Sequence, residues 1–489
     1  MKPKKNSLTD MPKDKTNGEF PLALSYDDVL LVPHYSDIQT RKVIEITTHF
    51  TRGIKLNIPV VSANMDTVTE GRMATAMALE GGIGIIHRFM SIEEQAAEVK
   101  KVKRAENIFI NDPVTIRQEA TLGEALEVMK KNGVNGIIVA DAKKNLYGIL
   151  TARDVRFKTD PQLKVKDLMT PRKKLITAPK GITADAAMRL LDKHKLEKLP
   201  LVDKAGKLAG LVTAADFKKM REHARAAKDK DGQLLVGAAV GVKDGVERAK
   251  ALVHEGCDVL VIDIAHGHHI RCVELLKELK KKFAGVDVVA GNVATATGTV
   301  DLIKAGADAV KVGIGPGAAC STRIVAGSGV PQFTAVRQCV EAAKKYGIPI
   351  IADGGIKNSG DVAKAIGAGA ATVMIGNMFA GSLESPGEYY IEDGGAFKIY
   401  RGLASRDASM DRGGREGNAE RADRAPEGIG YRVTYKGEVK RILGNLVDGL
   451  QSGMSYTGAR NLKEFAEKAE FVRMTDAGMR ESVPRSHQQ

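Results

Sequence analysis

The chain has 489 residues, of which 43% are hydrophobic and 27% charged, so its length allows two or three domains of ordinary globular composition. Aromatic residues make up only 4% and Trp is absent, which argues against a base-stacking surface for single-stranded nucleic acid. The formal net charge is +14, but the basic residues are dispersed in short runs typical of solvated helix faces. We therefore expect small phosphorylated ligands rather than nucleic acid as partners.

Residues 1–20 are basic and contain no apolar core, so they predict a disordered N-terminal tail and not a secretory signal. No apolar run approaches the roughly 18 residues that a membrane span needs. The four cysteines show no CxxC spacing, which argues against a disulfide framework and a zinc site. A membrane partner is not expected, and the reducing cytoplasm is the default location.

Short apolar runs rich in β-branched residues recur along the chain, and each leads through a polar or glycine tip into a helical pattern. The eight runs cover residues 58–65, 81–87, 234–240, 259–265, 288–293, 309–315, 348–355 and 371–377. Amphipathic helices are expected between them, for example at 245–256, 269–283 and 359–370. Continuous apolar runs separated by helices are typical of buried parallel strands. The pattern predicts a (β/α)8 TIM barrel, with a doubly wound sheet as the alternative.

An internal repeat interrupts the predicted barrel between its second and third strands. The stretch that begins at Ile137 matches the stretch that begins at Leu199, so that Asp141 aligns with Asp203. The pair resembles tandem CBS modules at 107–160 and 164–220, and this resemblance implies a regulatory nucleotide bound between them. A purely structural insertion is the alternative. The predicted barrel then consists of residues 21–106 and 221–489, with a flap at about 400–437.

Cys320 lies in a glycine-rich loop, "GIGPGAACSTR", directly after the sixth predicted strand. The loop is not GxGxxG, so it does not match the dinucleotide-binding fingerprint. An accessible thiol beside Arg323 suits a nucleophile, although a loop cysteine without a role is the alternative.

The tips of the last two strands point to a phosphorylated ligand, because the phosphate site of a barrel often lies there. Asp353 can accept hydrogen bonds from two sugar hydroxyls, and the neighbouring glycines can expose backbone amides to a phosphate. The residues concerned are Gly354, Gly355, Gly376 and Asn377. Asp263, at the fourth tip, is a candidate for the ribose of a second ligand. Ordinary turn glycines are the alternative interpretation.

Long ordered motifs identify the chain as a member of the IMP dehydrogenase / GMP reductase family. The stretch around Cys320 resembles the catalytic loop of the family. Other family motifs resemble "SANMDTVTEGRMA", "VIDIAHGH", "IADGGIKNSGDVAKAIGAGA", "YRGLAS" and "PEGIGYRVTYKG" in this chain. The resemblance covers nearly the whole chain. It implies NAD-dependent oxidation of IMP to XMP, the committed step of guanine nucleotide synthesis, through a covalent thioimidate on a cysteine.

The resemblance also implies roles for individual residues. Cys320 would attack C2 of the purine, with Thr322 beside it and Arg412 of the flap activating water. The nucleotide would bind at Ser62, Asn64, Asp353, Gly354, Gly355, Gly376, Asn377, Tyr400, Arg401, Gly402, Leu403, Ala404 and Glu427. NAD would contact Asp263, Gly313, Ile314 and Gly315. A potassium ion would bind at Gly315, Gly317 and Cys320, with Glu481 and Ser482 of a neighbouring subunit, which implies a homotetramer or octamer.

Several positions depart from the pattern of the dehydrogenases. Gly413 stands where a tyrosine usually follows the flap arginine, and Arg415 is an alternative alignment for that arginine. Ala318 replaces a serine that usually contacts the phosphate. Asn64 resembles GMP reductase, which reduces GMP with NADPH and releases ammonia. IMP dehydrogenase is the main interpretation, GMP reductase the second, and a nucleotide-sensing protein with impaired catalysis the third.

Overall fold

The computed structural model of the chain describes residues 20–105, 110, 112–214, 223–406, 408 and 425–482. The chain divides into two compact units, one made of 1–105 and 225–489 and the other of 106–224. Residues 1–19 of the predicted N-terminal tail (1–20) and the flap arginines Arg412 and Arg415 lie outside the described residues.

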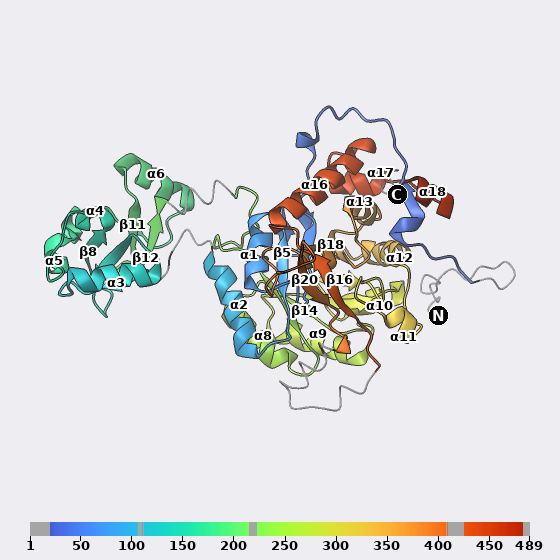
Figure 1. The fold of residues 1–489 in the computed structure, drawn as a ribbon, viewed down its shortest axis with the longest axis horizontal. Helices are drawn as coiled ribbons and strands as arrows, with labels where there is room; N and C mark the ends of the chain where they lie inside the picture. The colour runs from blue at the N-terminus through green and yellow to red at the C-terminus, as the bar shows by residue number, and fades with distance from the viewer. Residues whose placement is uncertain are drawn as a thin grey trace, which may run out of the picture. The chain divides into compact units, whose positions relative to one another are not determined.

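The larger unit is a closed barrel of eight parallel strands, which confirms the predicted fold and excludes the doubly wound sheet (Figure 1). Each strand coincides with one of the eight apolar runs, and only β15 begins outside its run, by one residue. They are β4 (Val60–Ser62), β5 (Ile83–Ile86), β13 (Gly237–Val240), β14 (Val259–Ile262), β15 (Asp287–Val293), β16 (Ala309–Val312), β17 (Ile350–Asp353) and β18 (Thr372–Ile375). The ring closes where β18 pairs with β4 and β5 pairs with β13.

Apolar side chains fill the barrel on both sides of its strands, which explains why the strand sequences do not alternate. An inner cluster includes Val61, Ile85, Val261 and Met374, and a larger cluster lies between the strands and the surrounding helices. The principal helices of this unit are α1 (Gly71–Leu79), α2 (Ile92–Ala105), α8 (Gly245–His254), α9 (Ile270–Lys282), α10 (Ala296–Lys304), α12 (Gln332–Lys344), α13 (Ser359–Gly367), α16 (Val439–Tyr456) and α17 (Leu462–Lys468).

Local signals explain where the helices begin and which face they bury. In α9 the buried residues Cys272, Leu275 and Leu279 recur at three- and four-residue spacing. The Asn358 side chain accepts from the Asp361 amide and so caps α13, directly after the tip of β17. These helices therefore hold the strand tips at fixed positions.

The smaller unit contains the repeat that the sequence predicts. Each half has a helix followed by an antiparallel pair: α3 (Leu122–Asn132), β7 (Gly136–Ala140) and β8 (Leu146–Thr151), then α6 (Ala184–His194), β11 (Lys198–Val202) and β12 (Leu208–Thr213). Asp141 and Asp203 occupy equivalent turns, since each Oδ1 accepts from the amides two and four residues further on. Short edge strands complete the sheets: β6 (Thr115–Ile116), β9 (Thr170–Pro171) and β10 (Ala178–Pro179).

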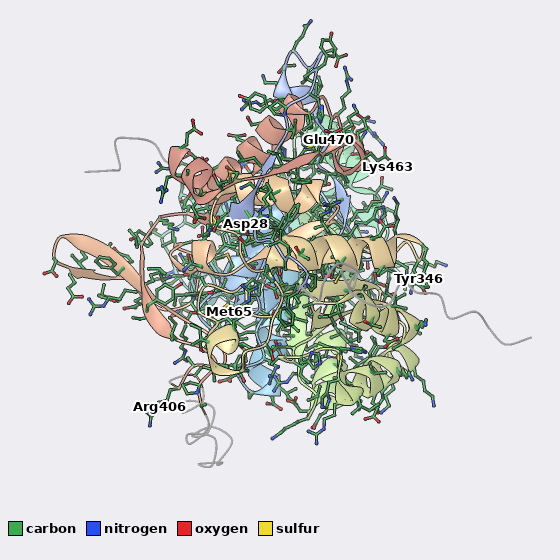
Figure 2. The ribbon with its side chains drawn as sticks, turned by 90° about the vertical axis from the view of Figure 1, so that its right-hand side faces the viewer. Asp28, Met65, Tyr346, Arg406, Lys463 and Glu470 are labelled. Atoms are coloured by element: carbon green, nitrogen blue, oxygen red, sulfur yellow. The ribbon has the colours of Figure 1, made fainter. Side chains whose placement is uncertain are left out.

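A three-stranded antiparallel sheet extends from the barrel (Figure 2). It consists of β19 (Tyr390–Glu392), β20 (Gly395–Arg401) and β21 (Gly430–Thr434). Near the N-terminus, a single helical turn (Tyr26–Asp28) leads into β1 (Val29–Leu31), which pairs with β22 (Phe471–Arg473). Within the described part of the chain, no helix is both long and apolar enough to cross a membrane.

Candidate functional site

The loop that carries Cys320 begins where β16 ends, at Val312, as the sequence predicts. Its backbone is held at two places: the Cys320 amide donates to the Gly317 carbonyl at 3.0 Å, and the Ile429 amide donates to the Ala319 carbonyl at 3.0 Å. Gly313, with φ of +153°, lies so close to β17 that a Cβ there would be 2.0 Å from the Asp353 carbonyl oxygen. Only glycine allows this approach of the Cys320 loop to the β17 tip.

Cys320 differs from the other three cysteines in its exposure. Its thiol is exposed, whereas Cys257, Cys272 and Cys339 are buried. Burial raises the pKa of Cys257 and Cys339 to about 12 and the pKa of Cys272 to about 11, so these three remain unreactive thiols. A nucleophilic role is therefore open to Cys320 alone among the four.

A short hydrogen-bonded chain leads away from the Cys320 thiol. The thiol donates to Thr322 Oγ1 over 3.2 Å, and Thr322 Oγ1 donates to Glu427 Oε2 over 2.7 Å. Arg323, in contrast, directs its guanidinium to the Val330 carbonyl at 2.7 Å. The predicted neighbour of the thiol is thus Thr322, and the carboxylate of Glu427 is the final acceptor of the chain.

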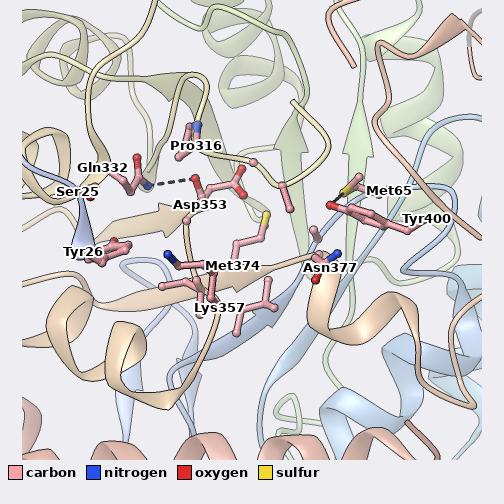
Figure 3. Close-up of a pocket in the computed structure, with 18 of the residues that line it drawn as sticks. Ser25, Tyr26, Met65, Pro316, Gln332, Asp353, Lys357, Met374, Asn377 and Tyr400 are labelled. Atoms are coloured by element: carbon pink, nitrogen blue, oxygen red, sulfur yellow. Dashed lines mark hydrogen bonds between the residues drawn. The ribbon is translucent and has the colours of Figure 1, made fainter. Parts of the chain in front are cut away.

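Asp353 lies at the end of β17 and is held by two partners, one from the adjacent strand β16 and one from the next strand, β15. Lys311 Nζ lies 2.7 Å from Asp353 Oδ2, and Asn292 Nδ2 donates to the same oxygen at 2.8 Å. The Lys311 side chain is 4% exposed and that of Asp353 is 22% exposed. Gln332 Nε2 donates to the Asp353 carbonyl at 3.1 Å, which fixes the backbone of the tip as well (Figure 3).

The glycines that follow β17 and β18 line a cavity of about 280 Å³ next to Asp353. Gly354 and Gly355 have φ of +95° and +81°, and a Cβ on Gly354 would lie 3.2 Å from the Gly317 nitrogen. Gly376 and Asn377, at the end of β18, line the same cavity. The predicted phosphate-binding residues at the ends of β17 and β18 therefore come together beside the loop that carries Cys320.

A second cavity of about 510 Å³ holds Cys320 at its wall and shares Asp353, Gly354 and Tyr400 with the first. The two cavities adjoin at these shared residues, over the carboxyl ends of the strands, where the chemistry of barrel enzymes occurs, and together they are called the cleft. The larger cavity also contains the predicted second-ligand residue Asp263, whose Oδ2 accepts from Arg88 Nε at 2.8 Å.

Most of the remaining predicted residues lie at this cleft. The larger cavity is lined by Asn64, Gly313, Ile314, Gly315, Gly317, Thr322, Gly402, Leu403, Ala404 and Glu427. Ser62 is buried, and its hydroxyl accepts from Thr69 at 2.9 Å. Arg401 pairs with Asp66 at 2.7 Å. Glu481 and Ser482, at the end of α18 (Asp476–Glu481), are not among the lining residues of either cavity.

Sequence reasoning missed several polar residues of the two cavities, among them Lys311, Arg88, Gln332 and Tyr26. Lys311 carried a signal, because a lysine within an apolar strand is rarely buried without a partner. The other three gave none, since the residues that they pack against or bind are remote in the sequence.

Comparisons with known proteins agree with this geometry. Residues 23–485 match the model of the IMP dehydrogenase / GMP reductase domain. The inosine-5'-monophosphate dehydrogenase of Aquifex aeolicus is 53% identical over 464 residues, 94% of each chain, and that of Nitrosopumilus maritimus is 48% identical over 95% of this chain and 98% of the relative. A solved cysteine-to-alanine variant of Trypanosoma brucei GMP reductase, in complex with guanosine 5'-monophosphate, is 46% identical with a TM-score of 0.88 and covers 95% of this chain and 98% of its own. The chain belongs to the IMP dehydrogenase / GMP reductase family.

Proposed function

We propose that this chain is an IMP dehydrogenase, which oxidises IMP to XMP with NAD through a covalent intermediate on Cys320. The observation that carries the proposal is the exposed Cys320 thiol in the wall of a cleft. The other end of this cleft is lined by the glycines that follow β17 and β18. The relatives at about 50% identity that are named IMP dehydrogenase support it over nearly the full length of the chain.

The nucleotide follows the cleft from these glycines to the thiol. Its phosphate accepts hydrogen bonds from the amides around Gly355 and Gly376, and the Asp353 carboxylate accepts from the ribose diol. Lys311 and Asn292 orient that carboxylate by holding one of its oxygens. The base then lies beside Cys320, over Gly402 and Glu427.

The chain from Cys320 through Thr322 to Glu427 provides a route for the thiol proton. Each group donates to the next, so a proton that moves along it ends on the Glu427 carboxylate and leaves a thiolate. The thiolate adds to C2 of the hypoxanthine, and hydride leaves C2 for NAD, which supplies the electron acceptor. Water then adds to C2 of the thioimidate and the thiolate leaves, so that IMP, NAD and water give XMP, NADH and a proton.

The larger cavity suits NAD, because its Asp263 carboxylate can accept from a ribose diol while Gly313–Gly315 line the space next to Cys320. The predicted potassium site rests on carbonyls of Gly315, Gly317 and Cys320, and such neutral oxygens suit a monovalent cation. Glu481 and Ser482 of a neighbouring subunit would complete it in a tetramer.

The smaller unit is proposed to be the regulatory part of the protein. Its two matching halves support the assignment as tandem CBS modules, with an adenine or guanine nucleotide as ligand. A Trypanosoma brucei GMP reductase structure in complex with guanosine 5'-triphosphate, 43% identical to this chain over 93% of its length, fits this choice of ligand class. A reducing cytoplasm suits an enzyme that depends on a free, exposed thiol.

GMP reductase is the second candidate, because a solved GMP reductase is 46% identical to this chain and superimposes with a TM-score of 0.88. Gly413, in place of the flap tyrosine, also favours it. In that reaction the thiolate displaces ammonia from C2 of GMP, and hydride from NADPH then releases IMP from the same thioimidate.

The two candidates are separated by assaying the purified full-length protein with IMP plus NAD and, separately, with GMP plus NADPH. We expect NADH formation in the first assay, with little oxidation of NADPH in the second. NADPH oxidation on GMP without NADH formation from IMP would assign the chain as the reductase. No turnover in either assay would favour a nucleotide sensor.

A further inference from the structure

The segment before β1 forms one wall of the smaller cavity. Ser25, Tyr26 and Asp27 line this cavity together with the glycines that follow β17 and β18. The segment is fixed in place, since the Leu24 amide donates to Thr334 Oγ1 at 2.7 Å and Lys364 Nζ donates to the Tyr26 carbonyl at 2.9 Å. The position of Tyr26 is thus determined by α12 and α13, and not by the segment alone.

The Tyr26 hydroxyl is buried and has no hydrogen-bond partner among the residues that the structure describes. The residue is 1% exposed, and its ring packs edge-to-face against Phe333 with centroids 6.4 Å apart. The ring also lies directly against Gly355, where a Cβ would be 3.3 Å from its nearest carbon atom. Figure 3 shows the Tyr26 side chain pointing from the N-terminal segment toward the interior of the cavity, between Gln332 and Lys357.

An unpaired buried hydroxyl is unfavourable, because the group has lost its water without gaining a partner. A second such atom, Gln332 Oε1, belongs to a residue that lines the same cavity. Two unpartnered polar atoms on residues that line one small cavity are groups that a polar ligand could satisfy. Burial and the nearby Asp361 carboxylate raise the pKa of Tyr26, so its hydroxyl stays protonated and can donate.

The chemistry of this cavity favours an anion as the recipient of that hydrogen bond. Its lining includes Gly354, Gly355 and Gly376, whose lack of a side chain lets an anion approach the backbone, and the cation Lys357, which pairs with Asp27. Ala318 lines the same cavity and has no hydroxyl to contribute. Tyr26 therefore provides a hydroxyl donor at the phosphate end of the cleft.

We infer that the Tyr26 hydroxyl donates a hydrogen bond to the 5'-phosphate of the bound nucleotide, and that Tyr26 is therefore a substrate-binding residue. This inference rests on the proposed function, since it needs a nucleoside monophosphate in the cleft. It adds a donor from outside the barrel strands to the phosphate site, positioned by the segment that precedes β1.

The test is Tyr26→Phe in the full-length protein, which removes the hydroxyl and keeps the ring. We expect IMP, measured by calorimetry, to bind roughly 10- to 100-fold more weakly, the factor for a lost hydrogen bond to a charged group. Inosine, which lacks the phosphate, should bind with unchanged affinity, and this shows that the variant is folded. The ligand-free melting temperature should stay equal or rise, since an unpaired buried hydroxyl is removed.

Tyr390→Phe is the matched control, because Tyr390 also has a buried hydroxyl without a partner but lies on β19, away from both cavities. It should leave IMP affinity unchanged. Equal IMP affinity in wild type and Tyr26→Phe, or an equal loss of inosine and IMP affinity, would overturn this inference but leave the proposed function standing. Wild-type protein that binds neither IMP nor GMP would refute the proposed function, and the inference with it.

Discussion

Replacing Lys311 by Met tests how the barrel holds its nucleotide-binding carboxylate. Lys311 Nζ contacts Asp353 Oδ2 at 2.7 Å and also pairs with Asn292 Oδ1, from a side chain that is 4% exposed. Removing one member of a buried ion pair typically costs about 3–5 kcal/mol, because the other charge is left unpaired. Since the Asp353 side chain is 22% exposed and water reaches it, we expect a loss of about 2–4 kcal/mol.

The assay is urea unfolding of the barrel transition at pH 7, at one fixed subunit concentration. Wild type, Lys311→Met, Asp353→Asn and the double variant form a thermodynamic cycle. The double variant should be more stable than the sum of the single losses predicts, because neither charge then remains unpaired. A Lys311→Met loss below about 0.5 kcal/mol, or strict additivity in the cycle, would refute the assignment of Lys311 as the partner that holds Asp353.

Three further predictions follow from other parts of the molecule. Deleting residues 107–220 should leave a folded, active barrel that no longer responds to ATP or GTP, and a soluble but inactive product would show that the insertion contributes to the site. Arg412→Ala should keep a first-turnover burst of NADH about equal to the enzyme concentration while it suppresses the steady state, because an arginine without a tyrosine partner is a weak base; an unchanged steady state would transfer the role to Arg415. Burial raises the pKa of Asp258 to about 6 from 3.8, although Lys103 pairs with it, so its contribution to stability is present at low pH and is lost as the pH rises through 6. Wild type should therefore gain about 2 kcal/mol relative to Asp258→Asn between pH 7 and pH 4, and parallel pH profiles in urea unfolding would contradict this.

The barrel was predictable because each buried strand leaves a local signal. Runs such as 259–265 are too short and too apolar for a surface helix, and a polar tip marks the end of each strand. The position of Cys320 after the sixth strand was predictable for the same reason. The three-stranded sheet from Tyr390 to Thr434 was not, since its strands are half exposed and β21 is separated from β20 by the flap.

The residues of the site could be predicted from the sequence more readily than the hydrogen bonds and ion pairs between them. Asp353 and Asp263 are visible as polar residues at strand tips, but their partners Lys311 and Arg88 are 42 and 175 positions away in the chain. The closure of the barrel, and not any local pattern, brings them together. Tyr26 was hidden for a different reason: it precedes the first barrel strand in an irregular segment that acquires its role only by packing against α12 and α13.

The most direct test of the covalent mechanism is mass spectrometry of the peptide that contains Cys320. Full-length protein is mixed with IMP and NAD, quenched with acid within the first turnovers and digested. The account predicts a nucleotide adduct on Cys320 that requires both IMP and NAD, and it predicts that Cys320→Ala binds IMP but forms neither adduct nor NADH. Steady NADH formation without any adduct, or a Cys320→Ala variant that turns over at a rate near that of wild type, would contradict it.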